Sequence, residues 1–117
     1  MPTSVPAWSS RAAQFDDLVL DSIERIPAPY AEAIEGVEFA VEEVPPADPS
    51  PWEDGEVALS RVYPSHRGQP TRIVIYRRPV ELRAEPSERA EFVHGLVVQQ
   101  LAQVLGLSPR DLDPRFD

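Results

Sequence analysis

The stretch RIVIYRRPV, residues 72–80, carries the clearest strand signal in the chain. Its residues 73–75 form an unbroken β-branched run, and the turn residues Gly-Gln-Pro at 68–70 end two residues before this run. β-Branched side chains favour strands, and turn residues mark where a strand begins. The pattern predicts a strand over Thr71–Tyr76 that is central in its sheet and ends at the Arg-Arg-Pro segment. A short helical turn is expected to follow over Pro79–Arg83.

Two weaker strand signals lie upstream of this run. Val37, Phe39 and Val41 alternate with glutamate or alanine, which predicts a half-buried strand over Val37–Val44. A second extended segment is expected over Glu56–Val62. Four prolines fall within seven residues from Pro45 onward, so residues 45–55 are predicted to form a surface loop.

Helical periodicity precedes the strands. Apolar residues recur every three or four positions from Phe15 to Ile26, which predicts a first helix over Ser10–Arg25. Ser9 or Ser10 is expected to cap this helix and Pro27 to stop it. A short second helical turn is expected over Pro29–Glu35.

The last helix is expected to begin at Pro86 and to end at Gly106. Gln99 and Gln103 lie four positions apart on one stripe, and Gln100 lies close enough to the buried face to be expected nearly buried. Amides at the edge of a core need hydrogen-bond partners, so they either bond the sheet edge and buried water or mark a present or former site. The buried face is predicted to consist of Val93, Val97, Leu101, Val104 and Leu105.

Together these elements predict an α+β fold, in which a small three-stranded sheet has the first and last helices packed on one face. A chain of 117 residues and 13.1 kDa suits a single domain. The domain is expected over residues 10–112. A disordered N-terminal tail is expected at 1–9 and a C-terminal tail at 113–117.

Charge and composition argue against several functional classes. With 20 acidic and 11 basic residues, the net charge of −9 repels nucleic-acid phosphates and anionic membranes. The absence of cysteine excludes disulfides, thiolate nucleophiles and cysteine-rich zinc sites. No apolar stretch approaches the roughly 20 residues of a membrane span, and the first residues lack a signal-peptide pattern. A cytoplasmic protein is expected.

Four segments together resemble the minimal zincin-like metallopeptidase family. They are FDDLVLDSIERIP (15–27), VEFAVEEVPP (37–46), RIVIYRRPV (72–80) and the helix ending LGL (105–107), in the family's order. The resemblance implies a zincin-like fold whose last helix carries H-E-x-x-H, then a glycine and a later acidic ligand. In that motif two histidines four positions apart bind one zinc ion, and the glutamate acts as general base on the zinc-bound water.

The corresponding motif in this chain departs from the family pattern. The matching pentad is Gln99-Gln100-Leu101-Ala102-Gln103, so glutamines take the places of both histidines and of the general base. Gly106 is retained, but Pro109 falls where the acidic ligand commonly sits, with Asp111 two residues beyond. An amide is a weak zinc ligand and cannot accept a proton at neutral pH. We therefore expect no metal ion, no cofactor and no catalytic residue at these positions.

The resulting hypothesis is a pseudo-peptidase that binds a peptide or protein. In zincin-like folds the substrate lies extended beside an edge strand, and backbone pairing needs no metal. Two alternatives stay open: an active hydrolase with a rebuilt or non-zinc site, such as a metal held by Asp111 and a histidine, and a structural subunit of a homo-oligomer. The groove beside the last helix is expected to be lined by Trp52, Tyr63, Tyr76, Gln99, Gln100 and Gln103.

The remaining charged groups have a structural interpretation beside a functional one. His66 and His94 are expected to be exposed to solvent. The glutamates between residues 32 and 43 lack the spacing of a calcium loop and are expected to form a solvated face. A basic cluster either pairs with the chain's own carboxylates or binds an acidic partner segment; it consists of Arg72, Arg77, Arg78 and Arg83.

Overall fold

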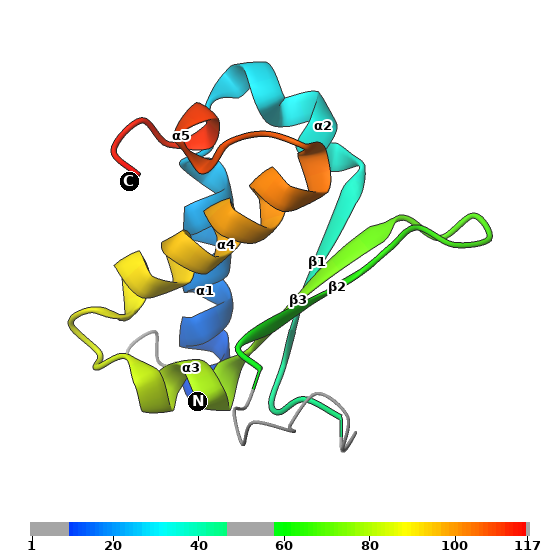
Figure 1. Cartoon of the computed structure of the whole chain (residues 1–117). Helices are drawn as coiled ribbons and strands as arrows, with labels where there is room; N and C mark the ends of the chain where they lie inside the picture. The colour runs from blue at the N-terminus through cyan, green and yellow to red at the C-terminus, as the bar shows by residue number, and fades with distance from the viewer. Residues whose placement is uncertain (1–9, 47–57, 117) are drawn as a thin grey trace, which may run out of the picture.

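The computed structural model describes residues 10–46 and 58–116 (Figure 1). The predicted N-terminal tail at 1–9 and most of the proline-rich loop lie outside these residues. No helix in the described part of the chain is both long enough and apolar enough to cross a membrane. The α+β class is confirmed by the elements, which are α1 (Arg11–Glu24), the 3₁₀ helix η1 (Ala28–Tyr30), α2 (Ala31–Glu35), β1 (Val37–Glu42), β2 (Ser60–Tyr63), β3 (Thr71–Tyr76), α3 (Arg77–Arg83), α4 (Arg89–Leu105) and α5 (Pro109–Leu112).

The sheet has the strand order β1-β3-β2, so the strand predicted to be central is confirmed as central. β1 runs parallel to β3 with Val37 opposite Thr71, and β2 runs antiparallel to β3 with Ser60 opposite Ile75. The apolar run of β3 suits this position, because residues 73–76 are fully buried. β1 ends at Glu42, two residues earlier than the sequence predicted.

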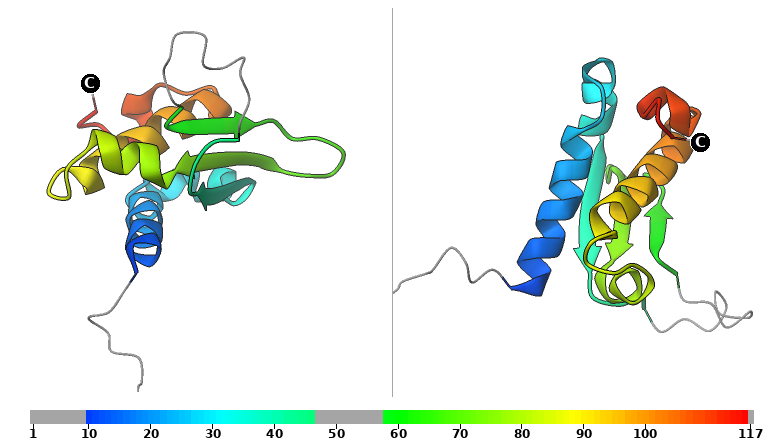
Figure 2. Two further views of the ribbon diagram at one scale, coloured as in Figure 1. Left: turned by 90° about the horizontal axis from the view of Figure 1, so that it is seen from below. Right: turned by 90° about the vertical axis from the view of Figure 1, so that its left-hand side faces the viewer.

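The helices α1 and α4 lie on the same face of the sheet, as predicted (Figures 1 and 2). Ser10 caps α1, since its hydroxyl accepts a hydrogen bond from the backbone N–H of Ala13 at 3.0 Å. α4 begins at Arg89 rather than Pro86 and ends at Gly106, whose φ of 70° is left-handed. Between the helices and the sheet lies the core, which includes Phe15, Val19, Ile73, Ile75, Val93, Val97 and Leu101.

A broader arc of α4 is buried than its periodicity predicted. The cause is α1, which packs alongside α4 and covers a second face of it. The expectation that His94 is exposed is therefore wrong, since this side chain is 3% exposed, whereas His66 is exposed as expected. Of the predicted buried face, Val93, Val97 and Leu101 are buried, whereas Val104 and Leu105 are only partly buried. The other buried residues of α4 are His94, Val98 and Ala102.

After α4 the chain folds back onto the domain. Ser108 caps α5, and Leu112 at the end of this short helix is buried. Asp113 then contacts His94, and Phe116 packs against the core. These contacts hold Asp113 and Phe116 against the domain, where the sequence suggested a tail.

Candidate peptide-binding site

The three glutamines occupy the C-terminal half of α4, the half that lies nearest the sheet (Figure 1). Gln99 and Gln103 are exposed, and Gln100 is half-buried rather than nearly buried. Helical periodicity explains this arrangement, because the apolar residues between them take the inward positions. In the part of the chain that the structure describes, no side-chain hydrogen bond holds any of the three amides.

The side chains present at this position do not fit zinc. Amide oxygens are poor substitutes for the imidazole and carboxylate ligands that zinc prefers. Asp111 is engaged elsewhere, since its Oδ2 accepts the backbone N–H of Ser108 at 3.0 Å and closes a capping box at the start of α5. Across residues 10–46 and 58–116, no three histidine, aspartate or glutamate side chains gather in a group that could hold a metal ion.

Next to α4, β2 forms one edge of the sheet. Tyr76 donates its backbone N–H to the carbonyl of Leu59 at 2.9 Å, which fixes the phase of the antiparallel pairing. Bonded and non-bonded pairs alternate in such a ladder. The backbone groups of Ser60 and Val62 therefore point away from β3, and no other strand among the described residues pairs with them.

The predicted groove residues Tyr63 and Tyr76 lie on the sheet face opposite the helices. Tyr63 stands opposite Arg72 across the strand pair, and Tyr76 shares the face of Arg72 because it is four residues further along β3. Neither tyrosine lines a groove between α4 and the sheet, which corrects the expectation from the sequence. The unbroken buried run in β3 hides the alternation that separates the two faces. Trp52 lies outside the described residues.

The Tyr76 side chain is fully buried on this face of the sheet. Burial and the interaction with Tyr63 raise the pKa of Tyr76 to about 12, so the phenol stays protonated at neutral pH. On the same face Arg72 pairs with Glu38 at 3.4 Å and with Glu42 at 3.6 Å. The Tyr76 phenol is therefore no general base at neutral pH.

A serine, a histidine and an aspartate form a buried chain of hydrogen bonds. Ser22 Oγ in α1 lies 2.7 Å from Nδ1 of His94, and Nε2 of His94 lies 2.8 Å from Oδ2 of Asp113. The carboxylate of Asp113 accepts a hydrogen bond from Nε2–H, and the Ser22 hydroxyl shares the second hydrogen bond with Nδ1. A nucleophile must be reachable by substrate, but Ser22 is 2% exposed. The chain of bonds therefore joins elements of the fold.

Part of the predicted basic cluster pairs internally. Arg77, at the start of α3, donates from Nε to Glu43 at 2.9 Å and from a terminal nitrogen to Glu81 at 3.0 Å. The hydrogen bond between Arg77 and Glu43 raises the pKa of Arg77 and lowers the pKa of Glu43. Internal pairing is thus confirmed for Arg72 and Arg77. Arg78 forms no side-chain ion pair with any described residue.

A comparison with known protein families matches residues 34–116 to a zincin-like metallopeptidase model. The matched region contains the whole sheet and the helix that carries the three glutamines. A search of curated proteins found no match to the chain. Because the family match covers well over half of the 117 residues and the fold agrees with it, this chain belongs to the zincin-like metallopeptidase family.

Proposed function

We propose that this chain is a non-catalytic member of its family, which has lost the zinc ligands and the general base and acts as a peptide- or protein-binding module. The observation that carries the proposal is the presence of Gln99, Gln100 and Gln103 at the three chemical positions of the motif. Hydrolysis by a zincin needs a metal ion to polarise the scissile carbonyl and a carboxylate to take a proton from water. Neutral amides perform neither step.

The outer edge of β2, which no described strand covers, supports the binding half of the proposal. An extended peptide that adds to this edge forms hydrogen bonds with the backbone groups of Ser60 and Val62. The exposed amides of Gln99 and Gln103 both donate and accept hydrogen bonds, which suits a polar peptide backbone. Proteins commonly cover or blunt an open edge because it invites uncontrolled pairing. A bound peptide provides such a cover.

Measuring the zinc content tests whether the chain has lost its metal site. The purified chain is incubated with excess zinc, passed through gel filtration and analysed for metal, and its Tm is measured with and without zinc. We expect no stoichiometric zinc and an unchanged Tm, because a ligand that binds only the folded state raises Tm. Stoichiometric zinc with a raised Tm contradicts the proposal and restores the hydrolase alternative.

Peptide binding tests strand addition at β2. The probe is an array of short synthetic peptides of random sequence, and its best binder is measured against variants. Ser60→Pro removes an outward N–H of the edge without removing a bond to β3, whereas Ser60→Ala keeps that N–H. We expect Ser60→Pro to abolish binding and Ser60→Ala to retain it, and we expect Trp52→Ala to weaken it. Equal binding by both Ser60 variants, or an array without binders, contradicts the proposal.

A further inference from the structure

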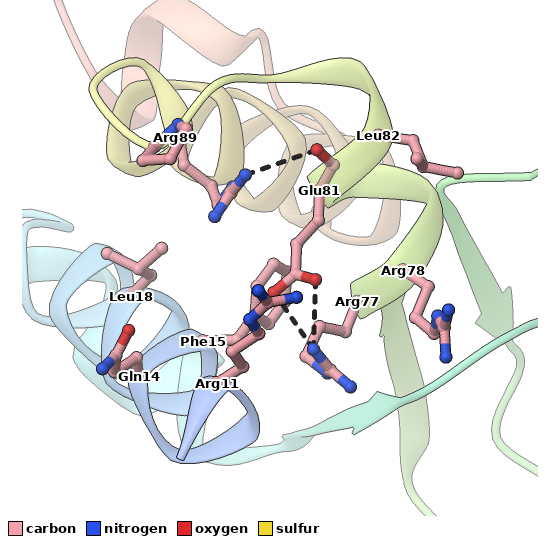
Figure 3. Close-up of a pocket in the computed structure, with 10 residues that line it drawn as sticks. Arg11, Gln14, Phe15, Leu18, Arg77, Arg78, Glu81, Leu82 and Arg89 are labelled. Carbon is pink, nitrogen blue, oxygen red and sulfur yellow. Dashed lines mark hydrogen bonds and ion pairs between the residues drawn. The ribbon is translucent and has the colours of Figure 1, made fainter. Parts of the chain in front are cut away.

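A second candidate site lies at the opposite end of α4 from the glutamines (Figure 3). A cavity of about 670 Å³ opens between the first half of α1, α3 and the start of α4. Arg89 lines it and is the first residue of α4, ten positions before Gln99, which corresponds to about 15 Å along the helix axis. The cavity is therefore separate from the edge of β2 and from the proposed function above.

Arginine dominates the charged lining of this cavity. Arg11, Arg77, Arg78 and Arg89 line it, and Glu81 contributes the single carboxylate among its lining residues. The whole chain carries a net charge of −9, so this local excess of positive charge runs against its composition. Guanidinium groups held near one another repel, and an anion between them removes that repulsion.

Internal contacts neutralise only part of this charge. Arg77 is paired with the carboxylates of Glu43 and Glu81. Arg89 instead donates to the backbone carbonyl of Ala84 at 2.9 Å. It also donates to the backbone carbonyl of Glu81 at 3.3 Å (Figure 3). Carbonyl partners fix the guanidinium group in place without cancelling its charge. Arg89 is thus a positioned cation that pairs with no carboxylate among the described residues.

Two other arginines of the lining have their donors available. Arg11 and Arg78 are exposed, and neither forms a side-chain hydrogen bond or ion pair with a residue in 10–46 or 58–116. The same lining contains an exposed apolar side chain, Leu82, which is 90% exposed. Phe15 at the base of the cavity is only 1% exposed and offers no ring face on which a nucleic-acid base could stack.

We propose that this cavity binds an acidic peptide segment of a partner protein, in which apolar side chains alternate with carboxylates. Each carboxylate can accept two parallel hydrogen bonds from one guanidinium group, and Arg11 and Arg78 supply two such groups. The apolar side chain packs on Leu82 and removes it from water. Inorganic phosphate satisfies the arginines alone and leaves Leu82 exposed, so the combination favours a peptide.

Fluorescence anisotropy with a labelled Glu-Leu-Glu-Leu-Glu peptide tests the proposal on the full chain. The double variant Arg11→Gln/Arg78→Gln is expected to weaken binding by about tenfold or more, because it removes two charge-assisted donors. Arg83→Gln/Arg110→Gln is the matched control, with the same change in net charge at exposed residues outside the lining. The control is expected to bind within about twofold of wild type. All substituted residues are exposed, so both variants should keep the wild-type Tm.

Four results overturn this assignment. An equal loss in both double variants indicates general charge attraction, and equal binding of a Gln-Leu-Gln-Leu-Gln peptide removes the role of the carboxylates. Displacement of the probe by an equal concentration of inorganic phosphate indicates a simple anion site. Failure of wild type to bind the probe removes the site altogether. Ser60→Pro, which tests the edge of β2, is expected to leave this binding unchanged, so the two proposals fail independently.

Discussion

The hydroxyl of Ser22 lies 2.7 Å from Nδ1 of His94, inside the interface where α1 packs on α4. Both side chains are almost closed to solvent. The other ring nitrogen bonds Asp113, so one imidazole connects two helices and the C-terminal segment. A buried ring with both nitrogens satisfied is tolerated in a core, and the loss of either partner leaves a polar atom with neither a partner nor water.

Ser22→Ala is therefore expected to lower the free energy of unfolding by about 1–3 kcal/mol, since Nδ1 of His94 then stays buried without a hydrogen-bond partner. Urea denaturation measures the change. Ser87→Ala, at an exposed position in the turn before α4, is the control and is expected to shift stability by less than about 0.5 kcal/mol. Equal effects of the two substitutions contradict a special role for the Ser22 hydroxyl.

Asp113 is expected to make stability depend on acidic pH. Burial opposes its ionisation, but hydrogen bonds from His94 and Arg115 outweigh that effect and lower the pKa of Asp113 from 3.8 to about 2. A carboxyl whose pKa is lower in the folded chain stabilises the fold fully above its unfolded pKa and loses this contribution as the pH falls. The Tm difference between wild type and Asp113→Asn should thus be widest at neutral pH and narrow between pH 3.8 and about 2. A constant difference indicates that Asp113 does not titrate in this window.

The helices and strands that could be predicted from the sequence are those with a clear hydrophobic pattern or a residue that ends the element. The β-branched run of Thr71–Tyr76 predicted β3 with its observed bounds, and Gly106 predicted the end of α4. α5 was missed because four residues are too few for a helical period. Ser108 followed by Pro109 is nevertheless the usual pattern of a helix start and could have indicated it.

The buried hydrogen bonds that join Ser22, His94 and Asp113 show which contacts a local sequence pattern does not predict. Ser22 falls on the apolar stripe of α1, three positions after Val19 and four before Ile26, so its burial could have been read from spacing. Its contact with His94 spans 72 positions and exists only because α1 packs on α4. The two faces of the buried strand β3 are likewise indistinguishable in sequence, which is why Tyr76 was assigned to the wrong face. The cytoplasmic location and the role of the glutamines stay predictions.

Substitution by alanine is expected to change the free energy of unfolding in opposite directions at Gly95, inside α4, and at Gly106, its C-cap. Gly106→Ala places a β-carbon at a φ of 70°, which should cost about 1–2 kcal/mol. Gly95→Ala lies inside the helix, where the new β-carbon meets only the Phe116 ring at 3.8 Å, an ordinary contact. Higher helix propensity should then stabilise the chain by about 0.5–1 kcal/mol. Urea denaturation separates the two, and a shift of the same sign in both contradicts the assigned cap.

Restoring the motif is expected to recover zinc binding only in part. The triple variant Gln99→His/Gln100→Glu/Gln103→His places two imidazoles four positions apart at exposed sites of α4, where they can share one metal ion. An acidic third ligand is missing, because the Asp111 carboxylate is held by the backbone of Ser108. Zinc should therefore bind weakly and raise the Tm of the triple variant slightly, while the wild-type Tm stays unchanged.

Adding Asp111→Ala to the triple variant decides whether that carboxylate can be recruited as the third ligand. If the capping box of α5 holds it in place, isothermal titration should give the same zinc affinity with and without Asp111. In the absence of metal, Asp111→Ala should lower the Tm of the wild-type chain and of the triple variant equally, because it removes the same cap from both. If Asp111→Ala instead abolishes zinc binding, the carboxylate leaves its cap to complete the site. Substitution of the three glutamines alone is then enough to restore a complete set of zinc ligands in this fold.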